Sequence, residues 1–161
     1  MQILSPRIRA AAWETGFTFL NGLPLRWRAT PLPEHLQTGN IGEEAAFFFL
    51  RRQSFIVVAR NWKTGRAPGD LDLVAWEGDT LCFVEVKTRS SRAFASAESA
   101  VDMHKRNHLR RLAKLYLVQS PPNTVARFDV VSVYIDPDRR SGKAEFDLFR
   151  NAFGWSETHT H

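Results

Sequence analysis

Charged residues in the segment 70–87 place the strongest constraint on the fold, because the rest of this segment has the apolar residues of two buried strands. Asp70 and Asp72 stand two residues apart, as do Glu85 and Lys87, and residues two apart in a β-strand point to the same face of the sheet. A Gly-Asp dipeptide between the two halves is typical of a two-residue hairpin turn. The segment therefore predicts a β-hairpin with three carboxylates and one ammonium on one face.

Counting outward from this turn predicts the opposing residues, which are Glu77 with Thr80, Val74 with Phe83, Asp72 with Glu85, and Asp70 with Lys87. Directly opposed side chains have Cβ atoms about 4.5–5.5 Å apart. Two ionised carboxylates at that distance repel each other, so either one is protonated or a cation lies between them. A hard divalent ion such as Mg²⁺ suits this position, since Lys87 offsets only one negative charge. A solvated hairpin face is the alternative, but the apolar flanks favour a central strand.

Length and composition indicate one globular domain. The chain has 161 residues, of which 43% are hydrophobic and 24% charged, enough for an ordinary core. No segment has the length and apolar character of a membrane span, and the N-terminus lacks the apolar stretch of a signal peptide. The single cysteine, Cys82, lies in a predicted strand and has no internal partner for a disulfide. We therefore expect a cytoplasmic protein with no membrane contact.

The pattern of elements predicts an α/β fold with a central mixed sheet of about five strands flanked by helices. We expect a helix from residue 38, strands at 55–59, in the two halves of the hairpin, at 127–135 and at 144–149, and a second helix over 98–118. Residues 60–69 are basic and contain two glycines and a proline, so they are expected to form a loop.

The chain is expected to have three regions. Residues 1–37 indicate an N-terminal appendage with a short helix and a proline-containing linker, residues 38–153 form the folded domain, and residues 154–161 form a polar C-terminal tail. The appendage is too apolar for a solvated tail. We expect it to pack on the domain or on a partner.

Basic residues indicate an acidic partner. Lysine and arginine number 22 against 17 acidic residues, which gives a net charge of +5 and points weakly toward a polyanion. Arg106, Arg110 and Lys114 recur every four residues on the second predicted helix. Such a stripe destabilises an isolated helix slightly and is explained equally well by nucleic acid phosphates or by a solvated helix face.

Several classes of active site are excluded by their missing motifs. None of the five histidines has metal-ligand spacing to another ligand type, which argues against a zinc site. The sequence has no GxSxG, P-loop or GxGxxG motif. The carboxylate hairpin with its lysine is therefore the one specific chemical signal.

An Asp on one strand followed by Glu-x-Lys on the next resembles the active-site pattern of restriction-endonuclease-like nucleases. A fuller set of residues between 38 and 153 is similar to the YraN family, a bacterial family also called uncharacterised protein family 0102, which shares a superfamily with archaeal Holliday junction resolvases. The set comprises Gly39, Gly42, Glu43, Arg60, Asn61, the segments 69–75 (GDLDLVA), 83–89 (FVEVKTR) and 127–131 (RFDVV), Ala100, Val101, Lys105 and Leu109.

The resemblance implies a restriction-endonuclease-like fold and an endonuclease, dependent on Mg²⁺ or Mn²⁺, that acts on DNA, including branched or otherwise structured DNA. It implies that Asp72, Glu85 and the carbonyl of Val86 hold the metal ion. Lys87 would orient or help deprotonate the attacking water and stabilise charge in the transition state. Glu43 matches the helix glutamate of resolvase-like members and would complete the metal site. Asp72, Glu85, Lys87 and Glu43 are thus the candidate catalytic residues.

Two residues depart from the family pattern. Position 70 is Asp where relatives usually have Glu, and Ser54 stands where a glycine commonly ends the first helix. Neither departure touches Asp72, Glu85 or Lys87.

The expected partner is DNA. The candidate contacts are basic residues of the predicted loop, the hairpin and the second helix, namely Arg60, Lys63, Arg66, Arg89, Lys105, Arg106, Arg110 and Lys114. A resolvase would also need a two-fold homodimer to cut both strands symmetrically. The main alternative is a nucleic-acid-binding protein of nuclease-like fold with little or no catalytic activity. A third is an interaction protein that works through residues 1–37.

Overall fold

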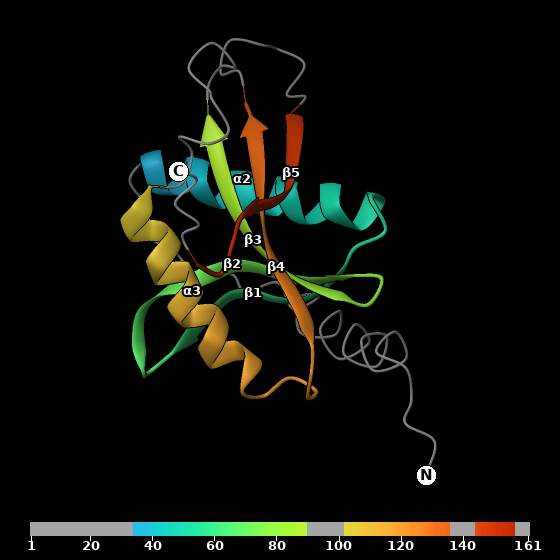
Figure 1. Ribbon diagram of the computed structural model, residues 1–161. Coiled ribbons are helices and arrows are strands. Elements are labelled where there is room, and N and C mark those ends of the chain that lie inside the picture. Colours follow the sequence, from blue (N-terminus) through green and yellow to red (C-terminus); the bar gives the residue numbers. More distant parts are fainter. Residues whose placement is uncertain (1–33, 90–101, 136–143, 157–161) are drawn as a thin grey trace, which may run out of the picture.

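The computed structural model describes residues 34–89, 102–135 and 144–156. It contains two helices and five strands in the order α2 (Glu34–Arg52), β1 (Ile56–Thr64), β2 (Ala67–Glu77), β3 (Thr80–Arg89), α3 (Met103–Leu117), β4 (Val125–Tyr134) and β5 (Glu145–Phe153) (Figure 1). The α/β architecture and this order confirm the prediction. The appendage predicted for 1–37 lies almost wholly outside the described residues. No helix in the described ranges has the length and apolar character needed to cross a membrane.

The five strands form one mixed sheet in the order β1-β2-β3-β4-β5. Strands β3 and β4 are parallel, whereas the other neighbouring pairs are antiparallel. A parallel pair needs a crossover connection, and α3 lies in the connection between β3 and β4. This arrangement is the mixed sheet of a restriction-endonuclease-like fold.

Each helix covers one face of the sheet (Figure 1). On one face, α2 contributes Ala46, Phe47 and Leu50 to a core with residues of β1 to β4. On the other, Leu109, Leu112 and Ala113 of α3 pack with residues of the sheet that include Val74, Phe83 and Phe128. We name this cluster the α3 core. Both faces of the central strands are therefore buried, as their nearly continuous apolar sequence requires.

Helix α2 ends in a Schellman motif. Ser54 N–H donates to the carbonyl of Arg51 at 3.2 Å, and Phe55 N–H donates to that of Leu50 at 3.0 Å. Ser54 adopts a left-handed conformation with φ of 66°, which costs a residue with a Cβ about 1 kcal/mol or more. This conformation explains why a glycine would suit the position better than the serine found here.

The prediction of a loop over residues 60–69 is wrong. Strand β1 continues to Thr64 and β2 begins at Ala67, so only residues 65–66 form a turn. Trp62 pairs with Leu71 across the two strands and packs edge-on against Tyr116 of α3, with ring centroids 5.2 Å apart. This packing of a large aromatic side chain supports strand structure where glycine and charge indicated a loop.

The boundaries of other helices and strands also differ from the prediction. Helix α2 begins at Glu34 rather than at residue 38, while residues 98–101 of the second predicted helix lie outside the described ranges. Strand β5 runs to Phe153, four residues beyond the prediction, because a bulge opposite Phe128 and Val130 lets its pairing with β4 continue. Trp155, assigned to the polar tail, packs against the α3 core.

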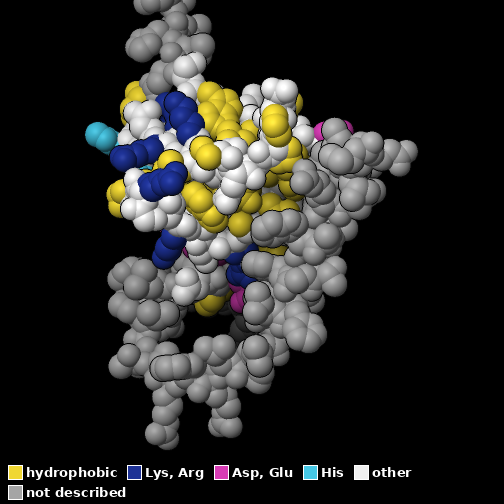
Figure 2. Space-filling view, turned by 90° about the horizontal axis from the view of Figure 1, so that it is seen from below, with side chains coloured by type: hydrophobic (Ala, Val, Ile, Leu, Met, Phe, Trp, Pro, Cys, Tyr) yellow, Lys and Arg dark blue, Asp and Glu magenta, His cyan; other side chains and the backbone are white. Residues whose placement is uncertain are grey.

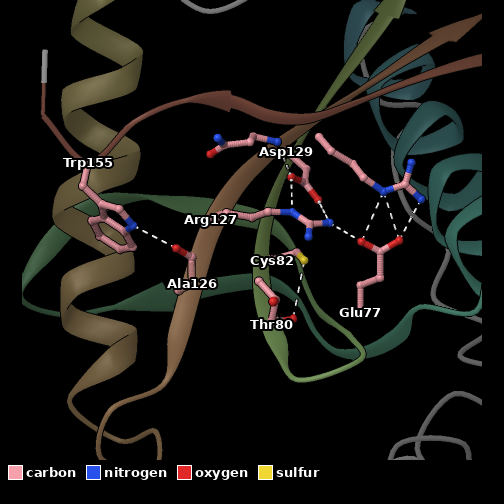
Figure 3. A network of polar contacts seen from close by, with 9 residues as sticks. Glu77, Thr80, Cys82, Ala126, Arg127, Asp129 and Trp155 are labelled. Atoms are coloured by element: carbon pink, nitrogen blue, oxygen red, sulfur yellow. Dashed lines mark hydrogen bonds and ion pairs between the residues drawn. The ribbon is translucent and has the colours of Figure 1, made fainter. Parts of the chain in front are cut away.

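A polar network links β2, β4 and β5 at the hairpin end of the sheet (Figure 3). Asp129 has no solvent exposure and accepts hydrogen bonds from Arg127 Nε at 2.8 Å and Nη2 at 2.9 Å. The N–H of Asn151 donates to the same carboxylate at 2.8 Å. Glu77 accepts from both Arg127 and Arg150, and these hydrogen bonds, Arg150 first, outweigh burial and lower the pKa of Glu77. We name these residues the Asp129 network.

Candidate functional site

The two strands of the charged hairpin separate at the candidate site. The predicted register holds from Glu77 opposite Thr80 to Leu73 opposite Val84, and the ladder of backbone pairs stops there. Asp72 and Glu85 are the next residues on each strand. The N–H of Val86 donates to Asp72 Oδ2 at 2.8 Å, so a side chain replaces the backbone partner that a continued ladder would supply.

Strand alternation places Asp72 and Glu85 on the α3 face of the sheet. Each lies two residues from a member of the α3 core, Val74 on β2 and Phe83 on β3. Both carboxylates are buried, with 9% of Asp72 and 3% of Glu85 exposed. The sequence prediction that the two acids share one face therefore agrees with the structure.

Two lysines hold the buried Glu85 carboxylate. Lys87 Nζ lies 2.8 Å from Glu85 Oε1, and Lys105 Nζ of α3 lies 3.1 Å from Glu85 Oε2. The first contact joins residues two apart on β3, as strand geometry predicts. The second brings in a residue that the sequence assigned to DNA contact, and no spacing in the sequence indicates this position.

The surroundings of the Asp72 carboxyl disfavour its ionised form. Burial raises its pKa from 3.8 to about 7, and the charge of Glu85 contributes in the same direction. The hydrogen bond from Val86 and the charge of Lys105 act in the opposite direction but are outweighed. Two buried acids on neighbouring strands, of which Asp72 has a raised pKa, form an environment that favours a bound cation.

Helix α2 brings Glu43 toward these acids. It can do so because Gly42 lies directly against β3, where an added Cβ would be 1.8 Å from Thr88 Oγ1. Burial raises the pKa of Glu43, as do the charges of Asp70 and Glu85, while a hydrogen bond with the Asn61 side chain lowers it. The charge of Glu43 therefore interacts with those of Asp72 and Glu85, and its role at a metal ion stays a prediction.

Asp70 is more exposed than Asp72 and Glu85. Its carboxylate lies 3.5 Å from Lys63 Nζ of β1 and is about one-third exposed. The predicted opposition of Asp70 and Lys87 lies beyond the paired part of the ladder. Asp70 thus forms a surface ion pair beside the buried site.

A metal ion would need some rearrangement of this site. In the described part of the chain, no three His, Cys, Asp or Glu side chains are arranged to hold a metal ion. Asp72 Oδ2 faces a backbone N–H, and both Glu85 oxygens face ammonium groups. The donor chemistry nevertheless fits Mg²⁺ or Mn²⁺, because both prefer carboxylate and carbonyl oxygens, which Asp72, Glu85 and the Val86 backbone can supply.

The predicted stripe of basic residues on α3 is divided between different environments. Arg110 is only 7% exposed; its Nε donates to the carbonyl of Gly154 at 2.9 Å and its Nη1 to Asn107 Oδ1 at 2.8 Å. Arg106 lies over the ring of Phe153, whereas Lys114 is exposed. The end of β5 covers one side of α3. The helical spacing of Arg106, Arg110 and Lys114 therefore overestimated how many of these charges are exposed to solvent.

The remaining predicted DNA contacts are spread over the surface. Arg60 lies over the ring of Phe47, 4.9 Å from its centroid, and Lys63 pairs with Asp70. Arg66 is exposed at the β1–β2 turn, and Arg89 is half-buried at the end of β3. Seen from below, Lys and Arg side chains gather on the side of the molecule where α3 lies (Figure 2).

A basic cleft lies between α3 and the segment after β5. Its volume is about 470 Å³, and its lining residues are Asn107, Arg110, Arg111, Lys114, Leu115, Trp155 and Ser156. None of these described lining residues is acidic. Trp155 is fixed by a 2.9 Å hydrogen bond from its Nε1 to the carbonyl of Ala126. The sequence prediction missed both Trp155 and Arg111; the indole in an otherwise polar tail was the one available signal.

Comparison with known proteins assigns the family. The model of "Uncharacterised protein family UPF0102" matches residues 42–133. The chain belongs to this family, the YraN family. A UPF0102 protein of Koribacter versatilis is 50% identical over 121 residues, covering 75% of this chain and 82% of the relative. One of Solibacter usitatus is 48% identical over 111 residues, covering 68% and 83%.

More distant UPF0102 members match over a similar length. A protein of Caldicellulosiruptor saccharolyticus is 38% identical over 118 residues, which cover 73% of this chain and 97% of the relative. The UPF0102 match begins at Gly42, beside Thr88, and includes Glu43, Asp72, Glu85 and Lys105. The candidate site therefore lies within the part of the chain that defines the family.

Proposed function

We propose that this UPF0102 protein is a metal-dependent endonuclease that hydrolyses phosphodiester bonds in DNA. The observation that carries the proposal is the buried pair Asp72 and Glu85 on adjacent strands, with Lys87 Nζ 2.8 Å from Glu85. Burial and the charge of Glu85 raise the pKa of Asp72 although two lysines contact Glu85, so the two ionised carboxylates remain unfavourable together without a further cation. A function that requires a divalent ion bound by both carboxylates would explain why these two acids are buried together.

Each residue has a role under this proposal. Asp72, Glu85 and the carbonyl of Val86 would hold Mg²⁺ or Mn²⁺, with Glu43 completing the site from α2. When bound, the ion would polarise the scissile phosphate and lower the pKa of a water molecule. Lys87, held against Glu85, would orient the attacking water through its Nζ and offset negative charge that develops on the phosphate.

DNA is the substrate that the basic surface supports best. The chain carries a net charge of +5, and the cleft on α3 combines cations with a fixed indole. Cations contact phosphates and an indole stacks on an unpaired base, which suits branched or structured DNA. Symmetric cutting of a four-way junction would require a homodimer. A cytoplasmic location fits the buried, unoxidised thiol of Cys82.

Cleavage assays test the proposal. Purified protein would be incubated with labelled linear, flapped and four-way DNA in Mg²⁺ or Mn²⁺, beside Glu85→Ala and Lys87→Ala. Asp79→Ala is the matched control, because Asp79 is an exposed acid at the tip of the same hairpin. The proposal expects cleavage by wild type and the control, and loss of cleavage in both site variants whose unfolding remains cooperative. Equal nicking by all four proteins would refute the site assignment.

A binding protein without catalytic turnover is the second candidate. It is favoured by the ion pairs of Glu85, whose two oxygens both lie against lysines. Such a protein would bind DNA with strong salt dependence and would neither cut it nor bind Mn²⁺ at Asp72 and Glu85. The same assays, read for binding as well as cleavage, separate the two candidates.

A further inference from the structure

Lys105 occupies an unusual position in helix α3. Asp102 caps this helix, and its Oδ1 accepts a 2.8 Å hydrogen bond from the N–H of Lys105. Lys105 is therefore in the first turn, which contains no acidic residue. Cations are unfavourable at this positive end of the helix dipole. Helix stability does not explain why a lysine stands here.

The Lys105 side chain ends at the candidate site. Its Nζ is 3.1 Å from Glu85 Oε2, while Lys87 Nζ is 2.8 Å from Oε1 of the same carboxylate. One buried acid is thus shared by two ammonium groups, one from β3 and one from α3. Both lysine side chains remain about one-third exposed, so each can also reach a ligand that approaches from solvent.

The charge balance of the site changes when a divalent cation binds. Ionised Asp72 and Glu85 are offset by Lys87 and Lys105, which leaves these four groups neutral together. A divalent ion at the two acids would add two positive charges and would compete with the ammonium at Glu85 Oε2. A DNA phosphodiester carries one negative charge, so it would offset half of this excess, most effectively if one lysine moves from Glu85 to contact it.

Lys105 is the lysine that is better placed to move. Lys87 lies two residues from Glu85 on the same strand, so β3 holds the two side chains side by side. Lys105 comes from a separate helix and has a flexible four-carbon stem. Its ammonium can leave Glu85 without any change in the strand that holds the carboxylate.

We propose that Lys105 is a second catalytic lysine of the UPF0102 site, which pairs with Glu85 before metal binds and then binds an oxygen of the scissile DNA phosphate. This inference rests on the proposed nuclease function and deepens it. It makes Lys105 a competitor of the metal ion when DNA is absent and a partner of the phosphate when DNA is present. Metal and DNA should therefore bind cooperatively.

Metal titration and cleavage of full-length Lys105→Met test this inference. Mn²⁺ binding without DNA is measured by calorimetry, and single-turnover cleavage of a four-way junction is measured in Mn²⁺. Lys105→Met should bind Mn²⁺ at least about threefold more tightly than wild type, because the competing ammonium is gone, yet cut at least about tenfold more slowly. Lys105→Arg, which keeps the charge, should recover part of the cleavage rate and guards against a folding defect.

Arg52→Met is the control, since Arg52 is an exposed cation at the end of α2 that is not among the residues lining the basic cleft or the candidate site. It should leave Mn²⁺ affinity unchanged. If wild type cuts DNA, the proposed function stands. In that case, unchanged or weaker Mn²⁺ binding by Lys105→Met, or cleavage by this variant at the wild-type rate, would overturn the role of Lys105. Absence of cleavage by wild type would instead reject the nuclease function itself, and the catalytic role of Lys105 with it.

Discussion

Val86 donates its backbone N–H to the Asp72 carboxylate at 2.8 Å, directly after the last backbone pair between β2 and β3, Leu73 with Val84. The carboxylate therefore takes over a hydrogen bond at the point where the two strands part. β3 meanwhile stays paired with β4 as far as Arg89. The same opening leaves Glu85 within reach of lysines from β3 and α3, so the fork in the sheet creates the candidate site.

Asp72→Asn should change the pH dependence of stability in the absence of divalent ions. The pKa of Asp72 is about 7 in the folded protein against an ordinary 3.8, so the folded state retains a proton over this range. Wild type should therefore lose stability relative to Asp72→Asn as pH rises from about 4 to 7. The asparagine variant should be more stable at pH 8 by about 4 kcal/mol, the free energy that corresponds to a pKa raised from 3.8 to about 7. Urea unfolding in chelator at pH 4.5 and pH 8 measures the difference.

Asp79→Asn serves as the control for this comparison, because Asp79 is exposed. It should show no such change between the two pH values. A constant stability difference between wild type and Asp72→Asn at both pH values would contradict the raised pKa. Added Mn²⁺ should stabilise wild type and leave Asp72→Asn unaffected.

Ser54→Gly should stabilise the fold. Ser54 has a φ of 66° at the end of α2, where glycine avoids the steric cost of a Cβ. The expected gain in free energy of unfolding is about 1 kcal/mol, measured by urea denaturation. Ser120→Gly is a suitable control, since Ser120 is absent from the described positive-φ residues. A loss of stability in Ser54→Gly would contradict the assigned conformation.

Arg111→Ala combined with Lys114→Ala should weaken DNA binding. Both side chains line the basic cleft and both residues are exposed. Each phosphate contact that is lost should reduce the slope of log affinity against log salt by about 0.7 to 0.9. Fluorescence anisotropy with Ca²⁺ and four-way DNA at several salt concentrations measures the slope, with Arg52→Ala on α2 as a control. An unchanged slope would remove the cleft from the DNA interface.

Arg127→Met should destabilise the protein strongly. It removes the main partner of Asp129, a carboxylate with no solvent exposure, and an unpaired buried charge costs about 3–5 kcal/mol. Thermal or urea unfolding should show this loss, while Mn²⁺ affinity of the folded fraction should be retained, because the Asp129 network lies at the hairpin end of the sheet. Arg150→Met, which removes a largely exposed partner of Glu77, should cost less than about 1 kcal/mol. Comparable losses in both variants would contradict the claim that Arg127 stabilises the fold by pairing with the buried Asp129.

The shared face of Asp72 and Glu85 could be predicted from the sequence because hairpin register depends on local rules. A glycine turn and strict alternation are enough to place opposing residues, and Gly78 has the positive φ of 61° that such a turn needs. The contact between Glu85 and Lys105 could not be predicted in this way. It depends on how α3 packs through Leu109 and Leu112, which is a tertiary relationship between residues twenty positions apart.

Burial of Arg110 shows a second limit of sequence patterns. Helical spacing places Arg106, Arg110 and Lys114 in one stripe, but it contains no information about what covers a helix. Gly154, which directly follows a strand that is longer than predicted, accepts a hydrogen bond from Arg110. The error in the length of β5 and the error in the exposed charge of α3 therefore have the same physical origin.

Cleavage of a labelled four-way junction by Glu85→Gln tests the central proposal most directly. Glutamine keeps the size of the buried side chain and removes only its charge, and the assay compares it with wild type in Mg²⁺ under single-turnover conditions. If the buried acids hold the metal ion of a nuclease, wild type should cut and Glu85→Gln should cut at least about 100-fold more slowly. Cleavage at the same rate by both proteins would contradict it.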